Sequence, residues 1–224
     1  MEVIDFDFRF VELYQELYAL EEYMESIESQ LPDLIQKEEK KAYESLREKG
    51  YEDDPIERQQ IQQRLHELIE EVLPKYFLGA ILVTLWAIFE SAILEIAKEV
   101  KDQQKQKVIL SDIDGDFLKR TNKYFNHILK IHIDTGDRSW QHLRMFYVLR
   151  NALAHANGRL DNIKKDKDKD EIKKWAKEDI GIKIINGSLL FNQEFARETY
   201  SIVFQVIKNL TDQVTAKYPK PINW

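Results

Sequence analysis

Glycine and proline are scarce in this chain, and that scarcity limits its fold more than any other feature. Only 7 Gly and 5 Pro occur among 224 residues. Since these residues mark turns and end helices, long helices are favoured over many short strands. Apolar residues make up 43% of the chain and charged residues 33%. This balance allows a real core inside a very polar surface, in one large domain or one domain with an extension.

The N-terminal segment carries an apolar stripe whose members are alternately three and four residues apart. They are Phe10, Leu13, Leu17, Leu20, Met24, Ile27 and Leu31. This heptad-like spacing is typical of a helix that packs along another helix. We expect Pro32 to stop or restart the helix and Gly50 to cap the arm that follows. Residues 1–54 are therefore predicted to form an N-terminal helical hairpin packed on the core, and residues 55–224 the main helical domain.

The rest of the chain alternates helical spacing with polar connections. Further helices are expected from Pro55 to about residue 99, over 117–131, over 139–156 and over 193–217. Pro74 is expected to kink or break the first of these. Asn186-Gly187 lies between two apolar runs and predicts a two-residue β-hairpin turn. The predicted fold class is mostly α, a helical bundle with one small β-hairpin before the last helix.

Metal and cofactor chemistry finds little support in the composition. The chain has 0 Cys, which excludes disulfides, Cys-ligated zinc and thiol catalysis. Its five histidines contain no HExxH pair, and no glycine-rich phosphate loop is present. Asp112, Asp114 and Asp116 alternate as in a calcium loop but lack the required Gly and Glu positions, so we interpret them as an acidic turn that caps a helix. We expect no metal and no cofactor.

Charge and hydropathy bear on location and partners. Residues 1–10 carry acids where a signal peptide needs bases, and the uncharged run Tyr76–Phe89 is too short to span a bilayer. A cytoplasmic protein without a membrane partner is expected.

Residues 1–73 hold 21 acids and 8 bases, and residues 74–224 hold 19 acids and 25 bases. The excess of bases would allow the C-terminal part to bind a polyanion. The alternative is that these charges only form the solvent-exposed faces of long helices.

One group of polar residues near the end of a predicted helix suits phosphate chemistry. Asn151 and His155 are four residues apart and share one helix face, whereas Arg150 lies about 140° around the helix from His155. Histidine exchanges protons near neutral pH, and arginine presents a fixed, forked charge to a phosphate. Asparagine offers both a donor and an acceptor. The alternative is that Arg150 and His155 only complement the helix dipole.

The segment FYVLRNALAHANG, which contains these three residues, resembles the R-x4-6-H motif of the HEPN superfamily. The match falls on Arg150, Asn151 and His155. The resemblance implies a HEPN-like helical bundle and a metal-independent endoribonuclease, a hydrolase that acts as a homodimer in phage defence or in a toxin–antitoxin system. It implies that His155 moves protons, Arg150 stabilises the charged phosphorane and Asn151 orients the reacting groups. Implied partners are RNA, a second copy of the chain, and a cognate antitoxin or regulator protein.

A basic segment follows the motif. Its predicted RNA-binding residues are Arg159, Lys164, Lys165, Lys173 and Lys174. Trp175 lies among these bases and is a possible stacking surface for RNA bases. Acidic residues are interleaved with the lysines, so the alternative is a solvated loop and short helix with Trp175 packed on the bundle.

Two other classes of function stay open. The first is a non-catalytic HEPN-like module that binds RNA, a nucleotide or a protein partner. The second is a structural helical protein that assembles through the N-terminal apolar stripe. The surroundings of His155 distinguish these classes, since a nuclease needs the imidazole accessible and a structural role predicts that it is buried or bonded to its own helix end.

Overall fold

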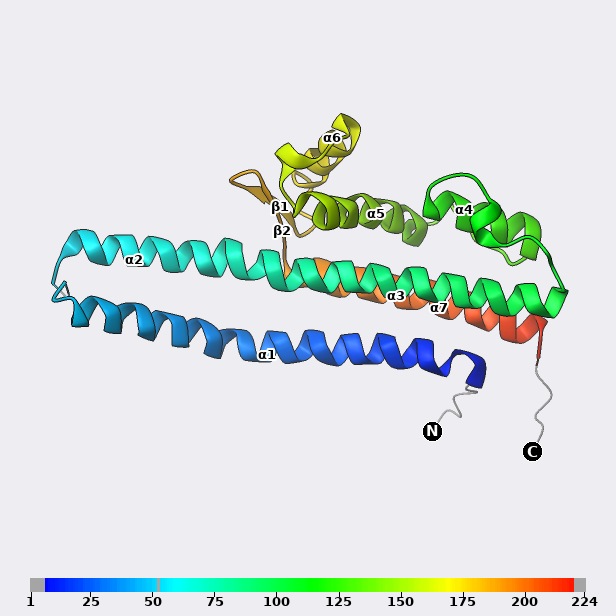
Figure 1. The fold of residues 1–224 in the computed structure, drawn as a ribbon, viewed down its shortest axis with the longest axis horizontal. Coiled ribbons are helices and arrows are strands. Elements are labelled where there is room, and N and C mark those ends of the chain that lie inside the picture. The colour runs from blue at the N-terminus through cyan, green and yellow to red at the C-terminus, as the bar shows by residue number, and fades with distance from the viewer. Residues whose placement is uncertain (1–6, 52, 220–224) are drawn as a thin grey trace. The chain divides into compact units, whose positions relative to one another are not determined.

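The computed structural model describes residues 7–51 and 53–219 and is mostly helical (Figure 1). Its α-helices are α1 (Val11–Glu48), α2 (Pro55–Glu67), α3 (Leu73–Gln104), α4 (Phe117–Lys123), α5 (Arg138–Ala156), α6 (Asp166–Trp175) and α7 (Gln193–Lys217). The 3-10 helices are η1 (Phe8–Phe10), η3 (Leu110–Asp112) and η5 (Leu160–Asn162), and the π-helical turns are η2 (Leu68–Val72) and η4 (Tyr124–Leu129). The antiparallel strands β1 (Ile182–Ile185) and β2 (Ser188–Phe191) precede α7. The prediction of a mostly α fold with one small β-hairpin before the last helix is confirmed.

The chain divides into two compact units that do not follow the predicted boundary between residues 54 and 55. The first unit contains the described residues up to Ala19, Val83–Arg150, and those from Arg197 onward. The second contains Leu20–Leu82 and Asn151–Ala196. Helices α1, α3, α5 and α7 each contribute residues to both units. The predicted division into an N-terminal segment of residues 1–54 packed on a helical domain of residues 55–224 stays a prediction.

The first unit is a helical bundle around an aromatic cluster. The Trp86 ring of α3 lies 5.4 Å from Phe89, 6.1 Å from Phe117, 5.2 Å from Phe146 and 5.4 Å from Tyr147, measured between ring centroids. Trp86, Phe89 and Phe146 are fully buried. Edge-to-face and tilted rings at these separations are favourable beyond their buried area, so this cluster holds α3, α4 and α5 together.

Helix α1 passes through Pro32 without ending, so the predicted interruption is wrong, and Val11–Glu48 is one helix and not two arms of a hairpin. Helix α1 instead ends at Glu48, and Gly50 with φ +73° precedes the turn into α2 (Figure 1). An internal proline costs about 3 kcal/mol. Burial of Met24 before it and Leu46 after it keeps both halves of α1 in place and offsets this cost.

The N-terminal apolar stripe is used inside the protein. Phe10, Leu13 and Leu17 are buried in the first unit, and Leu20 and Met24 in the second. These five members of the stripe are therefore covered by the chain's own residues, whereas Ile27 and Leu31 are half-buried. Assembly through the stripe stays a prediction.

Pro74 does not break its helix either, which corrects the second proline prediction. The helical run from Pro55 to Gln104 is continuous, and the π-helical turn η2 comes directly before α3. In this turn the Leu73 N–H donates to the Leu68 carbonyl, five residues back. A π-turn changes the helix register at the point where proline offers no N–H, and this lets the helix continue.

The most apolar part of this helical run would meet the length and composition of a membrane span. Its best 18-residue window has a mean hydropathy of 2.1, and 50% of that window is buried inside the protein. Core helices of soluble proteins meet the same criterion. The absence of a membrane partner, like the cytoplasmic location, therefore stays a prediction.

Candidate functional site

Helix α5 carries the three predicted catalytic residues, and its start is set by a side-chain cap. The Asp137 carboxylate accepts a hydrogen bond of 2.6 Å from the Trp140 N–H. The helix then buries one apolar face, formed by Trp140, Leu143, Phe146 and Leu149. This packing fixes the rotation of α5 and so decides which polar side chains reach solvent.

The end of α5 lies where the sequence predicted it. Asn157 and Gly158 adopt φ values of +49° and +66°, and the Gly158 N–H donates to the Ala152 carbonyl at 3.0 Å. This is the left-handed ending that favours Asn and Gly. His155 therefore sits in the last turn of the helix, two residues before the chain reverses direction.

Arg150 lies in the first unit, where it pairs with a residue that sequence reasoning did not identify. Its Nη2 atom is 3.4 Å from Oε2 of Glu90 on α3, and the two side chains are 23% and 30% exposed. The pair is thus half-buried, and Glu90 both orients the guanidinium and offsets its charge. Glu90 is 60 positions away in the chain. Its only signal in the sequence was that it ends an uncharged run.

Asn151 and His155 lie in the second unit. Asn151 is half-buried and His155 is exposed. Because they are four residues apart on a regular helix, both side chains are on one face. An exposed imidazole beside an amide is able to exchange protons with a bound molecule, which a buried histidine bonded to its own helix end is not.

His142, also on α5, is half-buried and bonded to another helix. Its Nε2 atom lies 2.9 Å from the Thr199 hydroxyl of α7. Burial lowers the pKa of His142, and the nearby Glu198 and Arg138 act on that pKa in opposite directions. The hydrogen bond between this half-buried imidazole and the Thr199 hydroxyl stabilises the packing of α5 on α7. We therefore do not include His142 in the candidate site.

The predicted RNA-binding residues all lie on the surface of the second unit. Arg159, Lys164, Lys165, Lys173 and Lys174 are exposed. The η5–α6 segment that carries the lysines is anchored by Ile163 and Ile172, which are buried. Trp175 is half-buried, so part of its ring packs on the protein.

Acidic neighbours offset some of this positive charge. Lys174 lies 3.8 Å from Glu178, Lys167 lies 3.7 Å from Glu171, and Lys169 lies 3.4 Å from Asp166. Exposed pairs of this kind contribute little to stability but reduce the local field. Lys164, Lys165 and Lys173 have no acidic partner at ion-pair distance within residues 7–51 and 53–219.

The acidic turn before α4 has the structural role that was predicted. The Asp116 carboxylate accepts a hydrogen bond of 2.9 Å from the Lys119 N–H at the start of α4. Burial raises the pKa of Asp116, but this bond and the Lys119 ammonium outweigh it and lower that pKa overall. Among the described residues no group of three or more His, Cys, Asp or Glu is arranged to hold a metal ion.

Comparisons of the chain with protein-family models, with curated proteins and with solved structures give no match. The class that the fold and site define is a mostly helical protein with an exposed histidine and an ion-paired arginine on one helix. Beyond that class, the functional argument depends on the residues of α5.

Proposed function

We propose that this protein is a metal-independent endoribonuclease of the HEPN type, which acts as a cytoplasmic homodimer in phage defence or in a toxin–antitoxin system. The observation that carries the proposal is the exposed His155 in the last turn of α5, with Asn151 on the same helix face. Arg150 directly precedes Asn151 in the chain and is oriented by Glu90. A proton-transfer group, a phosphate-binding cation and an orienting amide are the groups that RNA cleavage needs.

The proposed reaction uses the ribose of the substrate as the nucleophile. The 2′-oxygen attacks the adjacent phosphorus and loses its proton, the bond from phosphorus to the 5′-oxygen breaks, and that oxygen gains a proton. His155 supplies one of these proton transfers, and the His155 of the second copy is available for the other. The products carry 2′,3′-cyclic phosphate and 5′-hydroxyl ends. DNA has no 2′-hydroxyl and is therefore not a substrate.

Arg150 is assigned to the developing negative charge on the phosphate. A guanidinium has five N–H donors, so contact with the Glu90 carboxylate is compatible with contact to a phosphate. The carboxylate holds the guanidinium in one orientation before RNA binds, and such preorganisation favours transition-state stabilisation. Asn151 orients the phosphate or the imidazole ring.

The same ion pair favours the second candidate, a binding module without catalysis. A guanidinium already paired with Glu90 has less charge to offer a phosphorane. Incubation of the purified protein with labelled RNA in the presence of EDTA separates the two candidates. Cleavage supports the nuclease, and RNA binding without cleavage supports the module.

We expect the protein to be a two-fold dimer with α5 near the symmetry axis. Arg150 and His155 diverge by about 140° around one helix, and a symmetric second copy brings the two sets of groups toward a common substrate. Light scattering at micromolar concentration measures the mass, which should be twice 26.7 kDa. A monomer under these conditions contradicts the proposed shared site.

Charge reversal of the basic segment should weaken RNA binding and its salt dependence. The variant replaces Lys164, Lys165, Lys173 and Lys174 by Glu. For single strands, each lysine that no longer neutralises a phosphate should reduce the slope of log K against log salt by about 0.7. Filter binding of one RNA at several salt concentrations gives this slope.

A matched control reverses four exposed lysines of α1 and the turn after it, namely Lys37, Lys40, Lys41 and Lys49. It changes the net charge of the protein by the same amount without touching the η5–α6 segment. If both variants change the slope equally, RNA responds to the overall charge and the assigned RNA-binding residues are wrong.

A further inference from the structure

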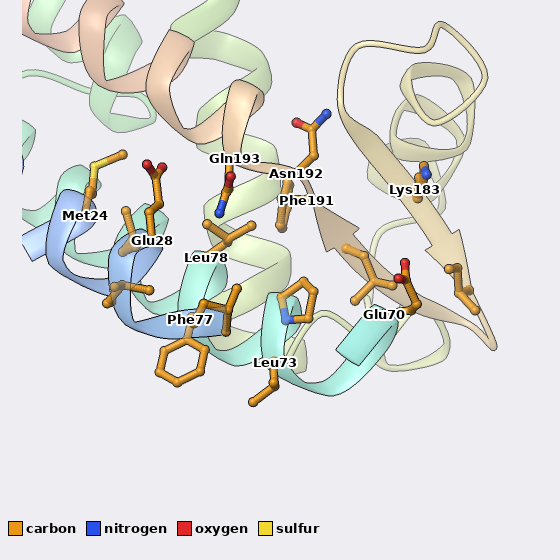
Figure 2. Close-up of a pocket in the computed structure, with 16 residues that line it drawn as sticks. Met24, Glu28, Glu70, Leu73, Phe77, Leu78, Lys183, Phe191, Asn192 and Gln193 are labelled. Atoms are coloured by element: carbon orange, nitrogen blue, oxygen red, sulfur yellow. The ribbon is translucent and has the colours of Figure 1, made fainter. Parts of the chain in front are cut away.

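The second unit contains a pocket that the proposed nuclease reaction does not use. Its volume is about 460 Å³, and it is lined by α1, by the helical run from η2 into α3, and by the β-hairpin with the start of α7 (Figure 2). All of its lining residues belong to the second unit. The motif residues Arg150, Asn151 and His155 are not among them.

Hydrogen bonds hold the β-hairpin wall of this pocket in place. At the hairpin turn, the Asn186 side-chain amide donates to the two carboxylate oxygens of Glu71 in η2, at 3.1 and 3.2 Å. Along β2, the Leu189 N–H donates to the Gly158 carbonyl at 2.8 Å. Residues next to Glu71, Asn186 and Leu189 in the chain line the pocket. The hairpin is therefore tied both to η2 and to the segment after α5, so the pocket is formed before a ligand binds, which favours binding.

The middle of the pocket is apolar. Leu78 of α3 and Phe191 of β2 are buried, whereas Leu73 and Phe77 of α3 are half-buried and keep surface for a ligand (Figure 2). The π-helical turn η2 leads directly into Leu73, and π-turns inside α-helices are frequent at functional sites. A preformed, concave and mostly apolar site of this volume is the usual form of a small-molecule binding site.

The charged lining residues place no counter-ion in this apolar middle. Glu70 and Lys183 are exposed, so both charges stay in water. Glu28 is half-buried and already interacts with another group of the protein. An ionised group placed between Leu78 and Phe191 would lose its hydration without a partner that offsets the loss. A ligand without charge avoids this cost.

We propose that this pocket binds an uncharged, mainly apolar small molecule that covers Leu73, Phe77 and Phe191. Burial of apolar surface supplies the affinity, which should therefore grow with the apolar area of the ligand and fall when the ligand carries a charge of either sign. The proposal is independent of RNA cleavage by the residues of α5.

Straight-chain alcohols test this dependence. They are titrated into the full chain labelled with carbon-13 at its methionine methyl groups. Met24 lines the pocket, whereas Met145 of α5 lies in the first unit and serves as an internal reference. With butanol, hexanol and octanol the Met24 signal should shift, the Met145 signal should stay unchanged, and the affinity should rise about fourfold for each added methylene. Octanoate and octylammonium should both bind at least about tenfold more weakly than octanol.

Two pairs of substitutions localise the binding. Leu73→Trp fills the pocket and should abolish the Met24 shift, whereas Val72→Trp, one residue away on an exposed position, should leave it unchanged. Phe77→Ala removes apolar lining and should weaken octanol binding about tenfold, whereas Tyr76→Ala changes an exposed ring outside the pocket and should not. Circular dichroism shows whether each variant is folded.

Several results would overturn the proposal. They are an unshifted Met24 signal, an affinity that does not rise with chain length, and an ion that binds as tightly as octanol. Equal effects within either pair of folded variants would also overturn it. A Met24 signal that moves with protein concentration alone, without a probe, would mean that a second copy of the chain covers the pocket in place of a small molecule.

Discussion

Replacing His155 by alanine should abolish RNA cleavage and leave the fold intact. The side chain is exposed and lies in the last turn of α5, so its removal creates no cavity. The helix end itself is held by Asn157, by Gly158 and by the bond from the Gly158 N–H to the Ala152 carbonyl, none of which involves the imidazole. Loss of a general acid–base group should slow cleavage by about 10²–10⁴-fold.

The measurement is the rate at which one labelled RNA is cut, in EDTA, by the wild type and by a variant whose circular dichroism is unchanged. His66→Ala is the matched control, since His66 is also an exposed histidine but lies on α2. The control should cut as fast as the wild type. A folded His155→Ala variant that keeps the wild-type rate would refute the assigned chemistry, and the protein would then be the binding module.

Glu90→Gln asks whether the ion pair of Arg150 supports the same reaction. If Glu90 orients the guanidinium of Arg150, the Glu90→Gln variant should cleave RNA more slowly, although its His155 is intact. If Glu90 only neutralises Arg150, RNA binding should instead become tighter. The rate of cleavage and the affinity for RNA of this variant therefore help to distinguish a nuclease from a binding module.

Local signals predicted the elements that depend on neighbouring residues. The bounds of α7, the end of α5 at Asn157-Gly158 and the Asn186-Gly187 turn all agree with the structure. The spacing of apolar residues predicts a helix, and residues that accept positive φ predict where a helix or strand ends. Both signals depend only on residues a few positions apart in the chain. The three motif residues were proposed in the same way, since they lie close together on one helix.

Features that depend on distant packing could not be predicted. The local preference of Pro32 and Pro74 is to end a helix, but burial on both sides of Pro32 and the π-turn before Pro74 outweigh it. The pairing of Glu90 with Arg150 likewise requires α3 and α5 to lie side by side. No spacing pattern in the chain contains that information.

Gly181→Ala should destabilise the protein strongly, because this glycine meets two constraints at once. Its φ is +82°, and a Cβ atom there would lie 2.2 Å from Oδ1 of Asn192 and 2.9 Å from Cβ of Phe195. That same Asn192 oxygen caps α7 by accepting a hydrogen bond of 2.8 Å from the Phe195 N–H. An added methyl group therefore displaces the cap as well as straining the backbone.

Backbone strain, disruption of the cap and overpacking together should cost about 3 kcal/mol. For a chain of this length the midpoint of thermal unfolding should then fall by roughly 6–12 °C, followed by circular dichroism. Gly187→Ala is the control, since Gly187 has φ +73° but nothing within 4 Å of its Cβ position. It carries only the backbone cost of about 1 kcal/mol, and its midpoint should fall by roughly 2–4 °C. Equal shifts in the two variants would mean that positive φ alone explains the glycine at 181, and that the cap of α7 tolerates the methyl group.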